Sequence, residues 1–263
     1  MKKTILFLLF SALFGLLLNA QNDTMYIMKN GAIVGRYNVS TDVDSLIYYL
    51  PTRGVFTDSR DGNTYDWVKI GTQVWMAENL KYLPSVVGPT TGSFTIPYYY
   101  VLGYYGTSIT EAKATANYND LGVLYNWTAA VNGSNGSNSV PSGVQGACPN
   151  GWHLPSHSEW SILINYLGGD YNAAGGKLKE VGTTHWIAPN TGATNETGFT
   201  GFPSGSRDHD GTFNFGFHYA TWWSSYSETS DIACYRFIYW DPDRVHFYCN
   251  HKDIAQGIRC LKN

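Results

Sequence analysis

Four cysteines limit how the second half of this 263-residue chain can fold. They are Cys148, Cys234, Cys249 and Cys260. Four cysteines allow three pairings. Cys234 and Cys249 lie almost symmetrically about residues 241–244 (Asp-Pro-Asp-Arg), a turn signal between two strand-like runs, so they can face each other across a hairpin. That pairing leaves Cys148 with Cys260. Free thiols and a metal site are the alternatives, although the close Cys-x-x-Cys pair of many zinc sites is missing.

The N-terminal segment indicates the compartment in which these cysteines are found. Lys2 and Lys3 precede an apolar run, residues 4–18, and small Ala20 follows before a polar stretch. This pattern is typical of a secretory signal peptide, here residues 1–20. The run is shorter than the roughly 20 residues of a membrane-spanning helix, with a retained signal anchor as the alternative. We expect an exported protein, secreted, periplasmic or at the cell surface, with oxidised cysteines and no membrane insertion after signal removal.

The charge balance excludes one large class of partner. The chain has 17 Lys and Arg against 20 Asp and Glu, a formal net charge of -3, and no basic run. Nucleic-acid binding depends on a concentration of positive charge against the phosphate backbone. We therefore expect no nucleic-acid partner, and look to glycans or cell-surface proteins instead.

A small β unit is expected between the signal peptide and the main domain, over residues 21–57. Asn30-Gly31 lies between two apolar runs, which is a strong signal for a β-hairpin. Residues 45–49 suggest a third strand, and residues 51–54 (Pro-Thr-Arg-Gly) suggest a linker.

The main domain is expected over residues 58–263, with a helix as its best-specified element. Ser156 and Glu159 form a capping-box pattern, apolar residues follow at helical spacing, and Gly168 ends the pattern.

Other elements of this domain are expected from weaker signals. We predict a hairpin from residues 64–70 and 73–76, a helix over 121–131 and a shorter helix over 172–181. Residues 84–118 suggest an ordered long loop, and the Gly/Ser/Asn-rich stretch 133–146 a mobile surface loop. Together the patterns indicate an α+β fold with a mostly antiparallel sheet, two to three helices and long loops.

Several motifs resemble one known family. They are residues 61–65 (Asp-Gly-Asn-Thr-Tyr), 68–80 (Val-Lys-Ile-Gly-Thr-Gln-Val-Trp-Met-Ala-Glu-Asn-Leu), 124–127 (Leu-Tyr-Asn-Trp), 148–156 (Cys-Pro-Asn-Gly-Trp-His-Leu-Pro-Ser) with Glu159-Trp160, 222–225 (Trp-Trp-Ser-Ser) and 257–260 (Gly-Ile-Arg-Cys). In this order they resemble the Fibrobacter succinogenes major paralogous domain. The resemblance implies a C-type-lectin-like fold, distantly similar to formylglycine-generating enzymes, with Cys148 bridged to Cys260. It implies no settled activity, and the Cys234/Cys249 pair is not part of the family pattern.

Aromatic residues, 16% of the chain, supply the main functional signal. We expect some of those crowded near the C-terminus to form a surface that stacks on sugar rings or grips a protein. The candidate ligand-binding residues are Trp222, Trp223, Tyr226, Tyr239, Trp240 and Tyr248. Packing of these rings beneath long loops is the alternative. His153, which lies in a family motif, is expected to be structural.

Two oxygen-rich stretches are weak candidates for calcium binding. Their carboxylates are Asp208 and Asp210 in one stretch and Asp241 and Asp243 in the other. Calcium needs six to eight oxygen ligands, so turns stabilised by the Asp side chains are the favoured interpretation. The Glu-Pro-Asn or Gln-Pro-Asp triplet of calcium-dependent sugar binders is absent; residues 188–190 read Ala-Pro-Asn. We expect no metal and no cofactor.

The function predicted from the sequence is an exported binding or adhesion module, without enzymatic activity, for glycan or protein ligands. A passive structural or assembly component of the cell surface is the first alternative. An oxidase related to formylglycine-generating enzymes is the second, and it is disfavoured because the two closely spaced cysteines that hold copper there have no counterpart. No catalytic triad, P-loop or His-Glu-x-x-His motif occurs.

Overall fold

The computed structural model describes residues 24–29, 32–38, 41, 52–170, 173–214 and 216–263. It divides the chain into two compact units, residues 1–50 and 51–263. In the described part of the first unit, strands β1 (Thr24–Lys29) and β2 (Ala32–Asn38) pair antiparallel, which confirms the predicted hairpin. The predicted signal peptide (residues 1–20) and the predicted strand at residues 45–49 lie outside the described residues.

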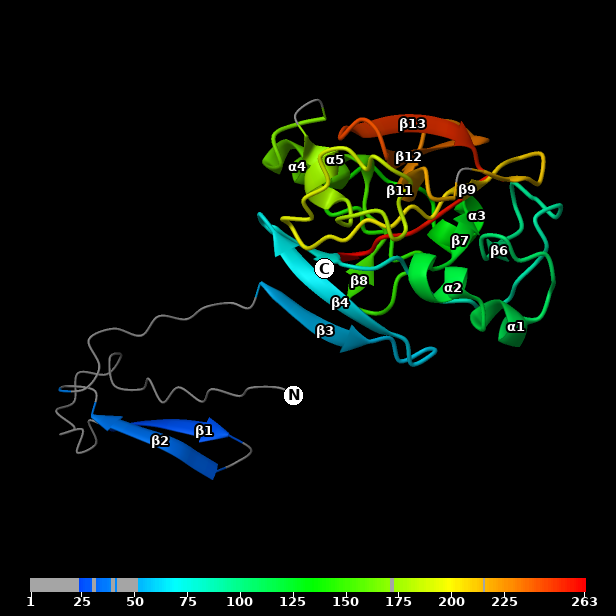
Figure 1. The fold of residues 1–263 in the computed structure, drawn as a ribbon. Helices are drawn as coiled ribbons and strands as arrows, with labels where there is room; N and C mark the ends of the chain where they lie inside the picture. Colours follow the sequence, from blue (N-terminus) through cyan, green and yellow to red (C-terminus); the bar gives the residue numbers. More distant parts are fainter. Residues whose placement is uncertain (1–23, 30–31, 39–40, 42–51, 171–172, 215) are drawn as a thin grey trace. The chain divides into compact units, whose positions relative to one another are not determined.

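The described residues of the second unit form three antiparallel sheets (Figure 1). The first has the order β3-β4-β5-β15-β8, the second β10-β9-β14-β7-β6, and the third β11-β12-β13. The strands of the first sheet are β3 (Arg53–Thr57), β4 (Thr64–Ile70), β5 (Gln73–Met76), β15 (Leu261–Lys262) and β8 (Trp152–His153). Those of the second are β10 (Phe213–Asn214), β9 (Ser206–Arg207), β14 (Ala255–Gln256), β7 (Leu124–Asn126) and β6 (Tyr99–Tyr100). Those of the third are β11 (Tyr219–Ser227), β12 (Ile232–Tyr239) and β13 (Val245–His251).

The β4–β5 hairpin is confirmed, and the strand that precedes it was not predicted. Strand β3 pairs with β4, with Arg53 opposite Val68 and Thr57 opposite Thr64. Arg53 and Gly54, which the sequence analysis assigns to a linker, belong to this strand. Gly54 is required there because a Cβ would lie only 2.7 Å from the indole ring of Trp67 on the neighbouring strand.

The capped helix is confirmed as α4 (His157–Tyr166). The Ser156 side chain accepts a hydrogen bond from the Glu159 backbone N–H at 3.1 Å, and the Glu159 carboxylate accepts from the Ser156 N–H at 2.9 Å. The apolar side of the helix is buried. On this side the ring centroids of Trp160 and Trp75 are 4.5 Å apart. The predicted short helix is present as α5 (Ala174–Leu178).

The helix predicted over residues 121–131 is confirmed only in part: residues 127–131 are helical and end at Asn132, but residues 122–126 are not helical. Helix α2 (Ala116–Leu121) ends at Gly122, whose φ of 79° is unfavourable for other residues, and residues 124–126 then form strand β7. Strand β7 pairs with both β6 and β14, so sheet hydrogen bonds replace helical ones. A new helix, α3 (Trp127–Val131), begins where the Asn126 side chain accepts a hydrogen bond from the Ala129 N–H at 3.0 Å.

The ordered loop predicted over residues 84–118 contains regular elements, and the surface loop predicted over residues 133–146 is partly buried. Residues 84–118 contain strand β6, helix α1 (Ile109–Lys113) and the start of α2. Residues 133–146 form no regular element, but Val144 and Ser142 are buried. The described residues thus contain five helices instead of two to three, although only α4, with 10 residues, exceeds six. No described helix has both the length and the apolar character needed to cross a membrane.

Both disulfides form as the cysteine pattern indicated. Cys148 is bonded to Cys260, which joins the segment before α4 to the segment before β15 across 112 residues of sequence. Cys234 is bonded to Cys249 between the directly opposed positions of β12 and β13. The three antiparallel sheets and the short helices confirm the predicted α+β class.

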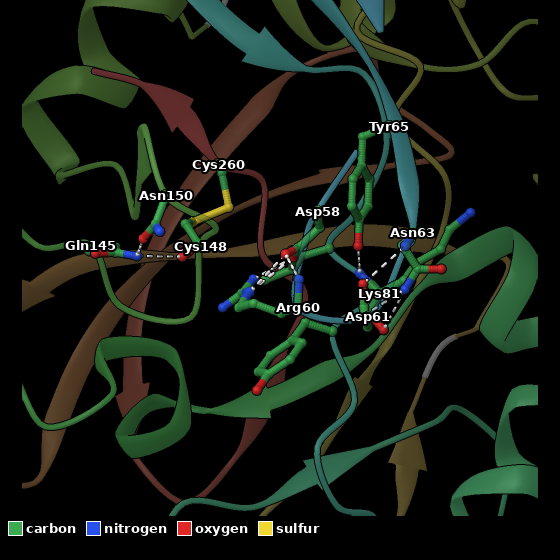
Figure 2. A network of polar contacts seen from close by, with 12 residues as sticks. Asp58, Arg60, Asp61, Asn63, Tyr65, Lys81, Gln145, Cys148, Asn150 and Cys260 are labelled. Atoms are coloured by element: carbon green, nitrogen blue, oxygen red, sulfur yellow. Dashed lines mark hydrogen bonds and ion pairs between the residues drawn. A yellow bond between two sulfur atoms is a disulfide. The ribbon is translucent and has the colours of Figure 1, made fainter. Parts of the chain in front are cut away.

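A polar network holds the turn between β3 and β4 (Figure 2). The buried Asp58 carboxylate accepts hydrogen bonds from Arg60 Nη2 at 2.7 Å and Nε at 3.0 Å. The Arg60 guanidinium also lies 3.9 Å from the centroid of the Tyr82 ring. A cavity of about 470 Å³ borders Arg60 and Tyr82. Since the positive charge of Arg60 is already paired with Asp58, this network is best explained as structural.

Candidate functional site

The outer face of the β11–β12–β13 sheet carries a row of aromatic side chains. Side chains alternate along β12, so that Cys234, Arg236 and Ile238 are buried while the rings between them are half-buried on the other face. The antiparallel register places Tyr219 of β11 opposite Tyr239, and His246 of β13 opposite Phe237. Aromatic residues from all three strands therefore lie next to one another.

These rings form a groove of about 710 Å³. Its lining consists of Gly216, His218, Tyr219, Tyr235, Phe237, Tyr239, Trp240, Asp241, Pro242 and His246. Small-molecule sites are typically concave, largely apolar and about 300–1,000 Å³ in volume. The groove has the size and character of such a site.

The rings of the groove fix one another in place. Tyr239 lies nearly perpendicular to Tyr219, Phe237 and Trp240, at centroid distances of 5.6, 5.2 and 6.0 Å. Phe237 is stacked on His246 at 4.9 Å and 13°. Edge-to-face and stacked pairs of this kind are the favoured geometries of aromatic contacts. The groove therefore exposes ring faces that are held by their neighbours.

Polar atoms are placed among these rings. The Tyr219 hydroxyl lies 3.2 Å from Ser206 Oγ, and burial raises the pKa of Tyr219 to about 12. Burial also raises the pKa of Tyr235, so both hydroxyls stay protonated at neutral pH. His246 Nε2 is buried and finds no hydrogen-bond partner among the described residues. Burial, together with the charge of Arg244, lowers the pKa of His246, which is therefore a neutral imidazole at pH 7.

A buried lysine supports one end of the groove from behind. The Lys179 ammonium donates to the backbone carbonyls of Thr191 at 2.7 Å, Tyr239 at 3.1 Å and Trp240 at 3.1 Å. An ammonium has three protons, so these bonds use all of them. Burial lowers the pKa of Lys179 to about 8, against the opposite influence of nearby carboxylates. The bonds hold the backbone that carries two groove rings.

Comparison with known proteins identifies the family. The family model described as the Fibrobacter succinogenes major domain matches residues 68–262. The chain belongs to this family. No curated protein and no solved structure matches. The comparisons show no similarity to formylglycine-generating enzymes. The matched part of the chain runs from within β4 to the end of β15 and includes every residue of the groove.

The structure separates the six aromatic candidates. Tyr239 and Trp240 line the groove. Trp222 and Trp223 are fully buried, on opposite faces of β11, in two different core clusters. Their indole N–H groups donate to Asn79 Oδ1 and to the Tyr125 carbonyl, both at 2.7 Å. These two family-motif tryptophans are therefore core residues, not available to a ligand.

The other two candidates lie outside the groove lining. Tyr226 is half-buried near His157, with ring centroids 6.3 Å apart. Tyr248 is 56% exposed and packs its edge against Tyr235. Sequence reasoning missed the contributions of Tyr219, Phe237 and His246, because alternation along a strand defines two faces without showing which face is covered.

Two of the four calcium candidates are engaged by hydrogen bonds within a turn, and the other two lie near the groove and near Gly192. Asp210 Oδ1 accepts from the Thr212 N–H at 2.9 Å, and Asp208 Oδ2 accepts from Asn214 Nδ2 at 3.0 Å. Asp241 lines the groove, and Asp243 packs against Gly192.

One cluster of three possible metal ligands occurs in the described part of the chain. It joins Glu228 to Cys234 and Cys249, with ligand atoms within 4.8 Å of one another. The two sulfurs are bonded to each other, so they do not present thiolates to a metal ion.

His153 of the family motif forms a buried pair with Glu159. His153 Nε2 lies 3.0 Å from Glu159 Oε1, and Nδ1 lies 2.7 Å from Asn263 Oδ1. Burial by itself lowers the pKa of His153, but the hydrogen bonds and the charge of Glu159 outweigh it, so the pKa is raised. With both ring nitrogens facing oxygen acceptors, the charged imidazolium fits this site. The pair joins β8, α4 and the end of the chain, which is a structural role.

The His153–Glu159 pair is expected to make stability depend on pH. A histidine whose pKa is raised on folding contributes stability that is complete below about pH 6.5 and is lost as the pH rises through the folded value. The stability advantage of the wild type over His153→Gln should therefore shrink from about pH 5.5 to pH 9 in urea unfolding. The exposed His251, replaced by Gln, is the control. An advantage that stays constant over this range would contradict the charged pair.

Proposed function

We propose that this protein is a binding module that holds a glycan in the aromatic groove of the β11–β12–β13 sheet. The observation that carries the proposal is the groove itself, about 710 Å³ in volume and lined by the faces and edges of seven aromatic or imidazole rings. The C–H groups on the flat side of a sugar ring are apolar and weakly positive, and aromatic faces are negative. Stacking between the two is therefore favourable.

The polar groups in the groove suit a ligand rich in hydroxyls. Tyrosine hydroxyls both donate and accept hydrogen bonds, and the Asp241 carboxylate accepts them. A few such groups among apolar walls give orientation and specificity. This arrangement needs no calcium.

Binding without chemistry is the function that we infer. Hydrolysis of a glycosidic bond normally uses two carboxyl groups about 5–9.5 Å apart. Among the described residues that line the groove, Asp241 is the only one with a carboxylate. Two disulfides suit an oxidising compartment, which supports export, and a lectin-like scaffold remains part of this proposal.

A glycan array, followed by calorimetry on the best ligand, tests the proposal. Tyr239→Ala should weaken binding by about tenfold or more, because truncation of a central aromatic contact typically costs at least 1–2 kcal/mol. Tyr166→Ala is the matched control, since that ring is 66% exposed and lies outside the groove.

Two outcomes would count against the proposal. If the disulfide-intact protein bound no glycan, a protein ligand or a structural role would replace it. If Tyr239→Ala bound as tightly as the wild type while folding normally, the glycan would bind elsewhere.

A further inference from the structure

We propose that the groove selects glycans that carry a protonated amine, such as deacetylated amino sugars, over neutral and acidic glycans. This inference rests on the proposed function and names its substrate class. It is drawn from the charge and the ring geometry of the groove.

The groove lining is negative in charge. Asp241 contributes a carboxylate, and none of the described lining residues is Lys or Arg. His246 is held neutral by burial and by the charge of Arg244. Burial chiefly raises the pKa of Tyr219 and Tyr235, and the charge of Asp208, which does not line the groove, is the smallest contribution to both shifts.

The nearest cations weaken this charge but do not line the groove: the carboxylates of Asp241 and Asp243 act on the Lys179 ammonium. Lys179 is fully buried, and its three protons are donated to backbone carbonyl oxygens, so none is left for a ligand. Arg244 affects the titration of His246 but is not a lining residue. Among the described lining residues, the one charged side chain is therefore a carboxylate, which attracts a cationic ligand and repels an anionic one.

The rings form a corner that suits a small cation. Tyr239 is nearly perpendicular to Tyr219, Phe237 and Trp240, at interplanar angles of 89°, 86° and 84°. Trp240 is in turn perpendicular to His218, at 88°. Rings at right angles present faces in more than one direction, and ring faces attract ammonium groups through cation–π interaction.

The carboxylate and the rings lie next to each other. Asp241 directly follows Trp240 in sequence, and both line the groove. A protonated amine that stacks against Trp240 can therefore also pair with the Asp241 carboxylate. The same sugar ring can stack through its C–H face on the neighbouring tyrosines. A neutral sugar can make only the stacking contact of its C–H face with the tyrosines.

The experiment compares β-linked glucosamine oligomers with the same oligomers in N-acetylated form, by calorimetry on the disulfide-intact protein. Acetylation removes the charge and keeps the sugar ring. We expect the free amine to bind about tenfold more tightly, and this ratio to fall several-fold in about 1 M salt. Asp241→Asn should weaken binding of the free amine much more than binding of the acetylated form, and so reduce the ratio. Asp231→Asn, at an exposed carboxylate outside the groove, should leave the ratio unchanged.

The outcomes distinguish the two proposals. Equal or tighter binding of the acetylated oligomer by the wild type would overturn the amine preference and leave glycan binding intact. Binding of neither oligomer, nor of any other glycan, would overturn both. If Asp241→Asn does not fold, the ratio for the wild type and its dependence on salt decide the question without it.

Discussion

Removal of the Cys148–Cys260 disulfide is expected to lower the free energy of unfolding by about 4–5 kcal/mol. The bond closes a loop of 112 residues, and in the chain-entropy account a loop of that length restricts the unfolded chain strongly. Both cysteines are fully buried, so Cys148→Ala with Cys260→Ala changes the exposed surface little. Denaturation of the double variant and the wild type by guanidinium chloride measures the difference.

The hairpin disulfide provides the matched comparison. Cys234 and Cys249 are 15 residues apart, for which the same account gives about 3 kcal/mol. Replacing both with Ala should therefore cost less than replacing the other pair. Equal losses, or a larger loss at the hairpin, would contradict the chain-entropy explanation and point to local packing instead.

Replacement of Arg259 by leucine is expected to lower the free energy of unfolding by about 3–6 kcal/mol. The guanidinium is fully buried and donates to Asn79 Oδ1 at 3.0 Å and to the carbonyls of Phe199 and Thr200. It also lies 4.3 Å from the centroid of the Phe199 ring. Each buried acceptor left without a partner costs about 1–3 kcal/mol. These contacts explain why an arginine precedes Cys260 in the motif of residues 257–260.

Urea unfolding measures this effect, with Arg53→Leu as its control because Arg53 is exposed on β3. Burial lowers the pKa of Arg259, because removing the charged guanidinium from water is unfavourable for the folded state. If Arg259→Leu left the free energy of unfolding unchanged, the carbonyl oxygens of Phe199 and Thr200 would have found other hydrogen-bond donors. A loss near that of Arg53→Leu would contradict the role assigned to Arg259.

Much of the scaffold was predictable from local patterns. The capping box at Ser156 and Glu159 specifies the start of α4 because both hydrogen bonds lie within one turn of helix. The turn residues between β12 and β13 bring Cys234 and Cys249 face to face, and the other pair follows by elimination. These features depend on residues close in sequence, or on a count of cysteines.

Elements that depend on distant partners were not predictable. Residues 124–126 lie within a stretch that we predicted as a helix, but they form β7 because β6 and β14 offer hydrogen bonds on both sides. Strand β3 was missed for the same reason, since its partner β4 defines it. Local propensity is a weak preference that tertiary pairing overrides.

The candidate site shows the same division. The sequence by itself determined the family, the two disulfides, the main helix and an excess of aromatic residues near the C-terminus. Only the tertiary structure decided that Trp222 and Trp223 are core and that Tyr239 and Trp240 line a groove with Tyr219 and Phe237. The reason is physical: a strand sends alternate side chains to opposite faces, and burial of either face depends on which distant segments pack against it.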